Sequence, residues 1–260
     1  MAVYDVNGNN ISDPIEKKTP WLSEMHRGYS SATVHENTLQ AFYRAWLNGA
    51  DGIEVDARLS SDEVYISCHD ATVTVDGVTY TISQETAETL TSLVLSIDPV
   101  YGDCKIPTLA SILKLCAFTG MIPYIDCKSI TAESIAKLVI NSGLSGKAVY
   151  CNLSQANAQA ILAIDANASF SVGYNANTIA SWAEALGTEV TRRSAIWSYS
   201  LDTAKVEEIK SYGFKTLIAN TNKTTYFQFM PDIVEFTSTS NCKKINQDYL
   251  DTIDFGVQLT

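Results

Sequence analysis

The stretch Gly49-Ala50-Asp51-Gly52-Ile53-Glu54-Val55-Asp56-Ala57-Arg58-Leu59 decides the fold class. It has the character of a β-strand, whose alternation places Glu54 and Asp56 on one face and Ile53 and Val55 on the other. Helical patterns lie before and after it, so neither face should meet much solvent, as in a parallel sheet. Two carboxylates buried on one face lose their hydration and repel each other. The free-energy cost is prohibitive unless a cation lies between them. The stretch therefore predicts an α/β fold with a metal site.

The segments around this strand follow a β-then-α rhythm. With 24–26 as the first strand, eight strand-like runs can be counted, and helical patterns separate most of them. Eight such units in a chain of 260 residues predict a single (β/α)8 barrel, the TIM-barrel architecture. The strands are expected near 24–26, 52–59, 64–69, 122–127, 147–151, 169–174, 195–201 and 214–219, and the helices after Asn37 and near 108–118, 131–142, 154–164, 176–187 and 202–212.

The rhythm breaks once, between residues 71 and 103. Alternating runs on either side of Asp76-Gly77 predict a β-hairpin. The segment follows the third predicted strand, and loops at that end of a barrel strand lie over the C-terminal mouth. We therefore expect a small hairpin-containing insertion at 71–103 that acts as a lid, within a barrel domain at 24–260. A short strand-like run at 233–237 has no place in this count.

Composition and charge limit the partners. Formal net charge is −11, and no stretch gathers several Lys or Arg, which argues against nucleic acid as a partner. No apolar run approaches the roughly 20 residues of a membrane span, so stable membrane insertion is not expected. The six cysteines include no Cys-x-x-Cys pair, and thus no zinc framework.

Residues 1–23 are expected to be a linker or an N-terminal extension. They contain the turn signal Val6-Asn7-Gly8-Asn9-Asn10 and lack the basic stretch and apolar block of a signal peptide. One expectation from such a start is a module excised from a longer, secreted or cell-surface protein. The sequence leaves the compartment and the oligomeric state open.

Further acid, base and cationic side chains fall at the ends of neighbouring predicted strands. His26 and His69 end the first and third, and alternation along the fourth places Asp126 and Lys128 on one face. Catalytic groups of (β/α)8 enzymes come from the C-terminal ends of several strands, so these residues are expected to share a pocket with the Glu-x-Asp pair. Three carboxylates without a Cys or His ligand favour a hard cation, Mg²⁺ or Ca²⁺, over zinc.

Each feature taken alone also has an ordinary structural explanation. A single histidine on an apolar strand is usually a core residue with one hydrogen bond, and a Glu-x-Asp pair on a strand usually faces solvent. His35, just before the first helix, is expected to be structural. The combination of these residues on adjacent strands is what favours a site.

Taken in order, the motifs resemble those of the glycerophosphodiester phosphodiesterase family. The resemblance runs from Met25 to about Asn222, and only the proline of the family's Pro-Glu-Asn-Thr motif is replaced. The matching motifs are His26-Arg27-Gly28 for His-Arg-Gly, His35-Glu36-Asn37-Thr38 for Pro-Glu-Asn-Thr, Gly49 to Asp56 for Gly-Ala-Asp-x-Ile-Glu-x-Asp, His69-Asp70 for His-Asp, and Ile106-Pro107-Thr108-Leu109 for Ile-Pro-x-Leu.

Two positions depart from the family pattern. Asp126-Cys127-Lys128 stands where the family usually has Glu-x-Lys, and this form is similar to that of the related sphingomyelinase D type phospholipases. Tyr199-Ser200 stands where the family has an aromatic residue and Thr, and Trp197 lies two residues earlier on the same face. The departures bear on the substrate rather than on the reaction type.

The resemblance implies metal-dependent cleavage of glycerophosphodiesters to glycerol phosphate and an alcohol. Alternatives are a sphingomyelinase D/phospholipase D-like or phosphatidylinositol-type lipase on the same barrel, and a non-catalytic binding module that retains a metal. The expected partner is a small-molecule phosphodiester or a lysolipid head group. The implied roles are one divalent cation, Mg²⁺ or Ca²⁺, on Glu54, Asp56 and Asp126, acid/base catalysis by His26 and His69, and substrate binding by Arg27, Lys128, Tyr199 and Trp197.

Overall fold

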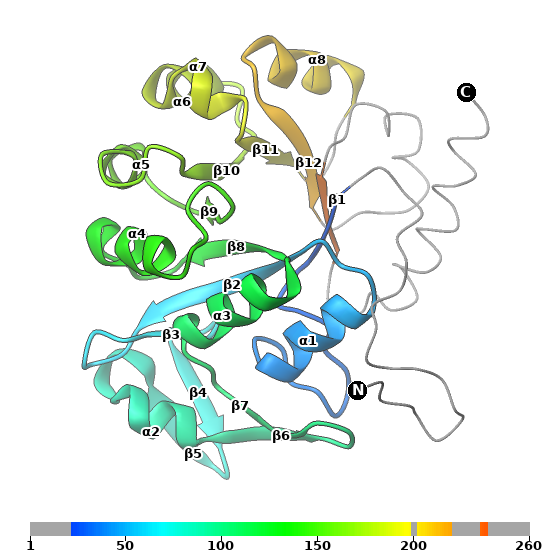
Figure 1. Cartoon of the computed structure of the whole chain (residues 1–260), viewed down its shortest axis with the longest axis vertical. Coiled ribbons are helices and arrows are strands. Elements are labelled where there is room, and N and C mark those ends of the chain that lie inside the picture. Colours follow the sequence, from blue (N-terminus) through cyan, green and yellow to red (C-terminus); the bar gives the residue numbers. More distant parts are fainter. Residues whose placement is uncertain (1–21, 199–201, 220–234, 239–260) are drawn as a thin grey trace, which may run out of the picture.

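The computed structural model describes residues 22–198, 202–219 and 235–238 (Figure 1). The strand pairings of these residues close eight parallel strands into a barrel. β1 pairs with both β2 and β13, which closes the ring and confirms the predicted (β/α)8 barrel. Around the ring the strands are β1 (Leu22–Met25), β2 (Gly52–Leu59), β8 (Ile122–Cys127), β9 (Val149–Cys151), β10 (Ser169–Gly173), β11 (Ala195–Ser198), β12 (Lys215–Ala219) and β13 (Glu235–Ser238).

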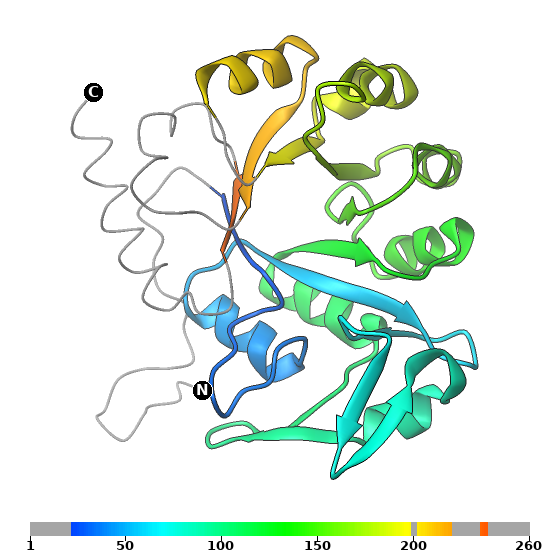
Figure 2. The same cartoon turned by 180° about the vertical axis from the view of Figure 1, so that it is seen from behind.

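Helices cover the outside of the ring, as the two opposite views show (Figures 1 and 2). Thr38, Thr108 and Ser154 each cap a helix by accepting a hydrogen bond from the backbone N–H three residues later. None of the helices within the described ranges is long and apolar enough to cross a membrane. These helices are α1 (Leu39–Leu47), α3 (Leu109–Thr119), α4 (Ala132–Asn141), α5 (Gln155–Leu162), α6 (Ile179–Leu186), α7 (Thr188–Thr191) and α8 (Thr203–Ser211).

The prediction that residues 64–69 form the third strand of the barrel is wrong. Tyr65–Ser67 forms β3, which pairs antiparallel with the outer end of β2. Only a turn separates the two strands, with the Ser60 N–H donating to the Val64 carbonyl, whereas a parallel connection needs a dozen or more residues. The eighth position in the ring belongs instead to β13, the run that the strand count left out. His69 therefore follows an antiparallel strand outside the ring.

After β3 the chain leaves the barrel for two hairpins and a short helix. β4 (Thr72–Val75) and β5 (Val78–Thr81) form the predicted hairpin, and Asp76 and Gly77 both have positive φ, 51° and 79°, as a tight two-residue turn requires. The 3-10 turn η1 (Ile82–Gln84), α2 (Ala87–Ser92), β6 (Val94–Asp98) and β7 (Gly102–Lys105) follow, so the segment extends to 105. It lies at one end of the ring beside β2 and α1 (Figures 1 and 2). That it acts as a lid stays a prediction.

A buried ion pair fixes this segment to helix α1. Arg44 donates from Nε and Nη2 to the two carboxylate oxygens of Asp98, both at 2.6 Å. The Asp98 side chain is fully buried, and its Oδ1 also accepts the N–H groups of Val100 and Tyr101. One carboxylate thus satisfies two backbone donors and one guanidinium.

We expect Asp98→Ala to lower the free energy of unfolding by about 2–4 kcal/mol, because the change strands a guanidinium and two N–H groups. Asp103→Ala is the matched control, since that carboxylate is half exposed and lies 3.9 Å from Lys105, and it should cost no more than about 0.5 kcal/mol. Urea denaturation of both variants measures the difference. Equal costs would show that the pair does not hold the segment.

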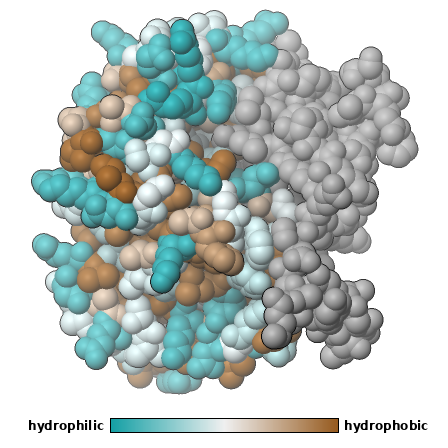
Figure 3. All heavy atoms as spheres, viewed as in Figure 1, coloured by the Kyte–Doolittle hydropathy of each residue, from teal (hydrophilic) through white to brown (hydrophobic). Residues whose placement is uncertain are grey.

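The main apolar core lies between the strands and the helices, around Phe42, Ile53, Val55, Leu109 and Ile125. On the face seen in Figure 3, hydrophilic and hydrophobic residues are interspersed over the described part of the chain. Because the outward sides of the strands supply the core, their inward sides can carry polar residues. The carboxylates of β2 and β8 occupy that interior.

Candidate active site

Strand pairing brings the predicted acidic residues together inside the ring. Asp56 of β2 pairs with Asp126 of β8, which pairs with Cys151 of β9, so these three lie at one level of the interior. Glu54 pairs with Tyr124 one level below. The period-2 interpretation of both strands therefore agrees with the structure.

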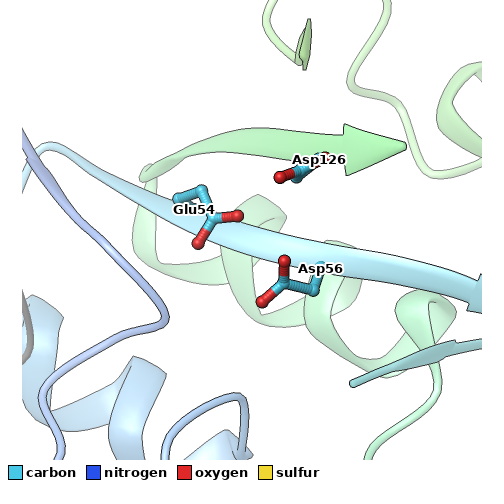
Figure 4. Close-up of side chains that lie close together, drawn as sticks. All are labelled: Glu54, Asp56 and Asp126. Atoms are coloured by element: carbon cyan, nitrogen blue, oxygen red, sulfur yellow. The ribbon is translucent and has the colours of Figure 1, made fainter. Parts of the chain in front are cut away.

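The three carboxyl groups converge. Glu54, Asp56 and Asp126 each offer an oxygen, and these oxygens all lie within 4.8 Å of one another. Figure 4 shows them pointing toward one another from β2 and β8. Glu54 and Asp56 are buried, at 6% and 1% exposure, so solvent does little to separate the charges. Within the described ranges, this is the one cluster of three such groups with metal-ligand spacing.

Two cations flank Asp56. Lys128 donates from Nζ to Asp126 Oδ2 at 2.7 Å and lies 3.3 Å from Asp56 Oδ1, while Arg27 Nε lies 3.3 Å from Asp56 Oδ2. Burial works against the charge of Lys128, but its carboxylate partners hold its pKa above the ordinary value. Arg27 also ties two carboxylates together, with its backbone N–H donating to Glu54 at 3.0 Å and its Nη1 to Glu36 at 2.9 Å.

The donor set fits a hard cation. Asp56 Oδ1 and Asp126 Oδ1 are buried oxygens without a hydrogen-bond partner. Burial, together with the neighbouring Asp56 and Asp126 carboxylates, raises the pKa of Glu54 well above its usual value. The free lone pairs of these buried oxygens could bind Mg²⁺ or Ca²⁺, and the bound cation would offset the repulsion between the carboxylates.

Asn37 supports the site from outside the ring. Its Nδ2 donates to Asp56 Oδ2 at 2.7 Å, and its Oδ1 accepts from the Asp56 N–H and from Ser67 Oγ. Its φ of 56° places it in the left-handed region, which asparagine tolerates better than most residues. The sequence suggested Asn37 or Thr38 as the cap of the first helix; Thr38 is the cap, and Asn37 orients a carboxylate.

His26 lies at the edge of the carboxylate cluster. It follows β1, with Nε2 3.9 Å from Glu54 Oε2 and one third of its side chain exposed. Burial lowers its pKa, and the positive charge of Arg27 lowers it further. A largely neutral imidazole at this place can take up a proton.

His69 lies apart from the barrel cavity. Its Nδ1 is 2.8 Å from Asp70 Oδ1, and its backbone carbonyl accepts two hydrogen bonds from the Arg58 guanidinium. It lines a second hollow, beside residues 35–37, although it is near enough to contribute to the lowered pKa of His26. The two histidines therefore line two different cavities.

A cavity of about 500 Å³ opens inside the barrel over the carboxylates. Glu24, His26, Glu54 and Asp126 form its polar side, and aromatic and apolar residues form the other. Predicted substrate-binding residue Trp197 is among the latter; Tyr199 lies outside the described residues. The apolar side consists of Tyr150, Leu153, Phe170, Val172, Trp182, Trp197 and Leu217.

The absence of a side chain at Gly173 lets the Trp197 indole lie against β10. A Cβ on Gly173 would come within 3.1 Å of Trp197 Cζ2. We therefore expect Gly173→Ala to push the indole into the cavity and to lower kcat/KM for a diester by about tenfold, the scale of a one-carbon change in a pocket. Steady-state kinetics in a Trp197→Ala background provide the control, because there the added methyl should have no further effect.

Sequence reasoning missed two residues of this site. Glu24 is buried and lines the cavity, two residues before His26 on the same side of β1. The alternation that identified Glu54 and Asp56 would have found it. Asn37 gave no such signal, because its role depends on a contact between a loop and β2.

Solved structures of known proteins share this fold. A crystal structure of a glycerophosphodiester phosphodiesterase from Agrobacterium tumefaciens matches with a TM-score of 0.68 and 20% identity, covering 85% of this chain and 96% of that one. An Oleispira antarctica phosphodiesterase in complex with the product sn-glycerol-3-phosphate matches with a TM-score of 0.65 and 18% identity, covering 91% and 96%. At these identities the likeness concerns the fold.

Sequence comparison adds the family. A glycerophosphodiester phosphodiesterase of Caldanaerobacter subterraneus subsp. tengcongensis is 36% identical over 108 residues, 40% of this chain and 44% of the relative. Glycerophosphodiester phosphodiesterase 1 of Rattus norvegicus is 33% identical over 113 residues, 40% and 32%. The matched region thus spans less than half of these relatives. The model of the glycerophosphoryl diester phosphodiesterase family matches residues 26–161, more than half of the chain. The chain belongs to this family.

Proposed function

We propose that this protein hydrolyses glycerophosphodiesters to glycerol phosphate and an alcohol, with one divalent cation and two histidines. The observation that carries the proposal is the convergence of Glu54, Asp56 and Asp126 between Arg27 and Lys128. A phosphodiester is an anion, and a purely acidic pocket would repel it; the cationic side chains and a bound cation reverse that field. Membership of the family supports the same reaction.

Each residue of the site has a task in this reaction. Glu54, Asp56 and Asp126 would hold the cation, which when bound neutralises charge on the phosphate oxygens. Arg27 and Lys128 supply fixed positive charge beside them, and Asn37 keeps the Asp56 carboxylate in place. Trp197 would contact the alcohol in the barrel cavity.

His26 and His69 would share the proton transfers. One takes the proton of a substrate hydroxyl as that oxygen bonds to phosphorus, and the other gives a proton to the departing alkoxide as its P–O bond breaks. The first product is then a cyclic phosphate, which water opens to glycerol phosphate.

The test is an assay of metal-stripped protein with glycerophosphocholine, with Mg²⁺, Ca²⁺ or EDTA, and with products identified by ³¹P NMR. Glycerol phosphate formed only with a divalent cation is the expected result. Phosphocholine as the product, or equal rates in EDTA, would contradict the proposal. No turnover of any diester would favour a non-catalytic module.

Asp126 supports a second candidate, a sphingomyelinase D/phospholipase D-like lipase, since this position resembles those enzymes more than the family pattern. The apolar side of the barrel cavity offers room for a larger alcohol. Turnover of lysophosphatidylcholine exceeding that of glycerophosphocholine would favour this candidate.

A further inference from the structure

A second hollow, of about 240 Å³, adjoins the site outside the barrel cavity. The segments 35–37 and 67–70 line it, together with Ile106. Residues 72–74 of β4 and Leu95 of β6 also line it, so the two-hairpin segment, residues 72–105, supplies a third of the lining residues. It is the smaller and the more polar of the two spaces.

Both histidines that line this hollow use the same ring nitrogen, Nδ1, in a hydrogen bond. His35 Nδ1 lies 2.8 Å from the Glu36 carbonyl, and His69 Nδ1 lies 2.8 Å from Asp70 Oδ1. A carbonyl and a carboxylate can only accept, so Nδ1 carries the hydrogen in both rings and the neutral form keeps a lone pair on Nε2. Within the described residues neither Nε2 has a hydrogen-bond partner, nor has the hydroxyl of Thr72. The wall therefore offers acceptors for hydroxyl groups.

Arg27 connects the hollow with the barrel cavity. Its backbone N–H donates to Glu54, which lines the cavity, and its guanidinium donates to Glu36, which lines the hollow. Asn37 likewise lines the hollow while it holds Asp56. A phosphate bound beside Arg27 would have one space on each side, and a phosphodiester has two ester arms.

We infer that the hollow binds the hydroxyl-bearing arm of the substrate, a small polyol such as glycerol, through His35 and Thr72. The barrel cavity, with its larger volume and aromatic wall, takes the other alcohol. This rests on the proposed function and deepens it, because it assigns each arm to one space. His35, which the sequence suggested as structural, becomes a specificity-determining residue. The backbone N–H of His35 donates to Ser96 Oγ of β6, so the two-hairpin segment also positions it.

The experiment compares two chromogenic diesters that differ by one hydroxyl. Glycerol p-nitrophenyl phosphate and 2-hydroxypropyl p-nitrophenyl phosphate both keep the hydroxyl next to the phosphate oxygen, and only the glycerol compound has the terminal one. We expect the wild type to prefer the glycerol diester in kcat/KM by about tenfold, the scale of one hydrogen bond. His35→Ala and Thr72→Val should bring the ratio toward one.

Glu88→Gln is the control, since Glu88 is exposed on α2 of the same segment and outside the hollow. Its ratio should match the wild type. Cleavage of both diesters with a ratio unchanged in both variants would overturn the inference and leave the proposed function intact. Failure of the wild type to cleave either diester would instead overturn the proposed function.

Discussion

Glu54→Gln is expected to cut turnover about 10²- to 10⁴-fold, the effect of removing several kcal/mol of charge stabilisation, and to make the cation-free protein more stable. The second effect follows from the raised pKa of Glu54, whose first cause is burial and whose next causes are Asp56 and Asp126. In the cation-free fold this group must either take up a proton or bury its charge, and both cost free energy. Glutamine removes that cost and keeps an oxygen to accept the Arg27 N–H.

Thermal unfolding in EDTA and in Mg²⁺ or Ca²⁺ checks both effects. The wild type should gain melting temperature with the cation, because ligand binding to the folded state stabilises it, and the variant should gain little. Isothermal titration should show the matching loss of affinity. Glu133→Gln is the control, since Glu133 pairs with Lys137 on the exposed face of α4 and should change neither turnover nor cation response. A variant that binds the cation as well as the wild type would refute the metal site.

Replacing His26 or His69 by alanine is expected to lower kcat by about 10²- to 10⁴-fold, the usual contribution of a general acid or base. The double variant should lose less than the product of the two single losses, because both groups act on one reaction. Free imidazole should restore part of the activity to each single variant. Diesters with different leaving groups then show which histidine is the acid and which is the base.

The p-nitrophenolate leaving group does not need a proton. Removing the histidine that acts as the acid should therefore lower kcat least on p-nitrophenyl diesters. If His69, which lines the hollow assigned to the hydroxyl-bearing arm, is the base, His69→Ala should remain slow on both p-nitrophenyl and alkyl diesters, and His26→Ala should recover on the former. Losses below tenfold for both variants would place the proton transfers elsewhere. A loss at His26 alone would show that His69 takes no part in the proton transfers.

The barrel could be predicted because its signals are local. The apolar and polar alternation of β2 and β8, and hydroxyl caps such as Thr108, are written within a few residues. The sequence does not distinguish β3 from a barrel strand, because an apolar run looks the same in a parallel and an antiparallel strand. The short connection after Leu59 could have shown the difference. Neighbouring residues determine whether a segment forms a strand, whereas distant parts of the chain determine which strand it pairs with.

The same distinction separates the parts of the site. Glu54, Asp56, Asp126 and Lys128 follow from parity on two strands that pair directly. The contacts of Asn37 with Asp56 and of His35 with Ser96 join segments 19 and 61 residues apart, through loops whose path no periodicity encodes. Tyr199 lies outside the described residues, so its predicted role stays a prediction.

The seam between β1 and β13 bears on how this chain folds. Leu22 pairs with Glu235, so the ring closes through residues from opposite ends of the described chain, while β2 and β8 are far nearer in sequence. Pairings of high sequence separation form slowly, because the loop entropy is lost before the contacts form. The carboxylate-bearing side should therefore assemble early and the seam last, so a nascent chain should present its three clustered carboxylates before its barrel is complete.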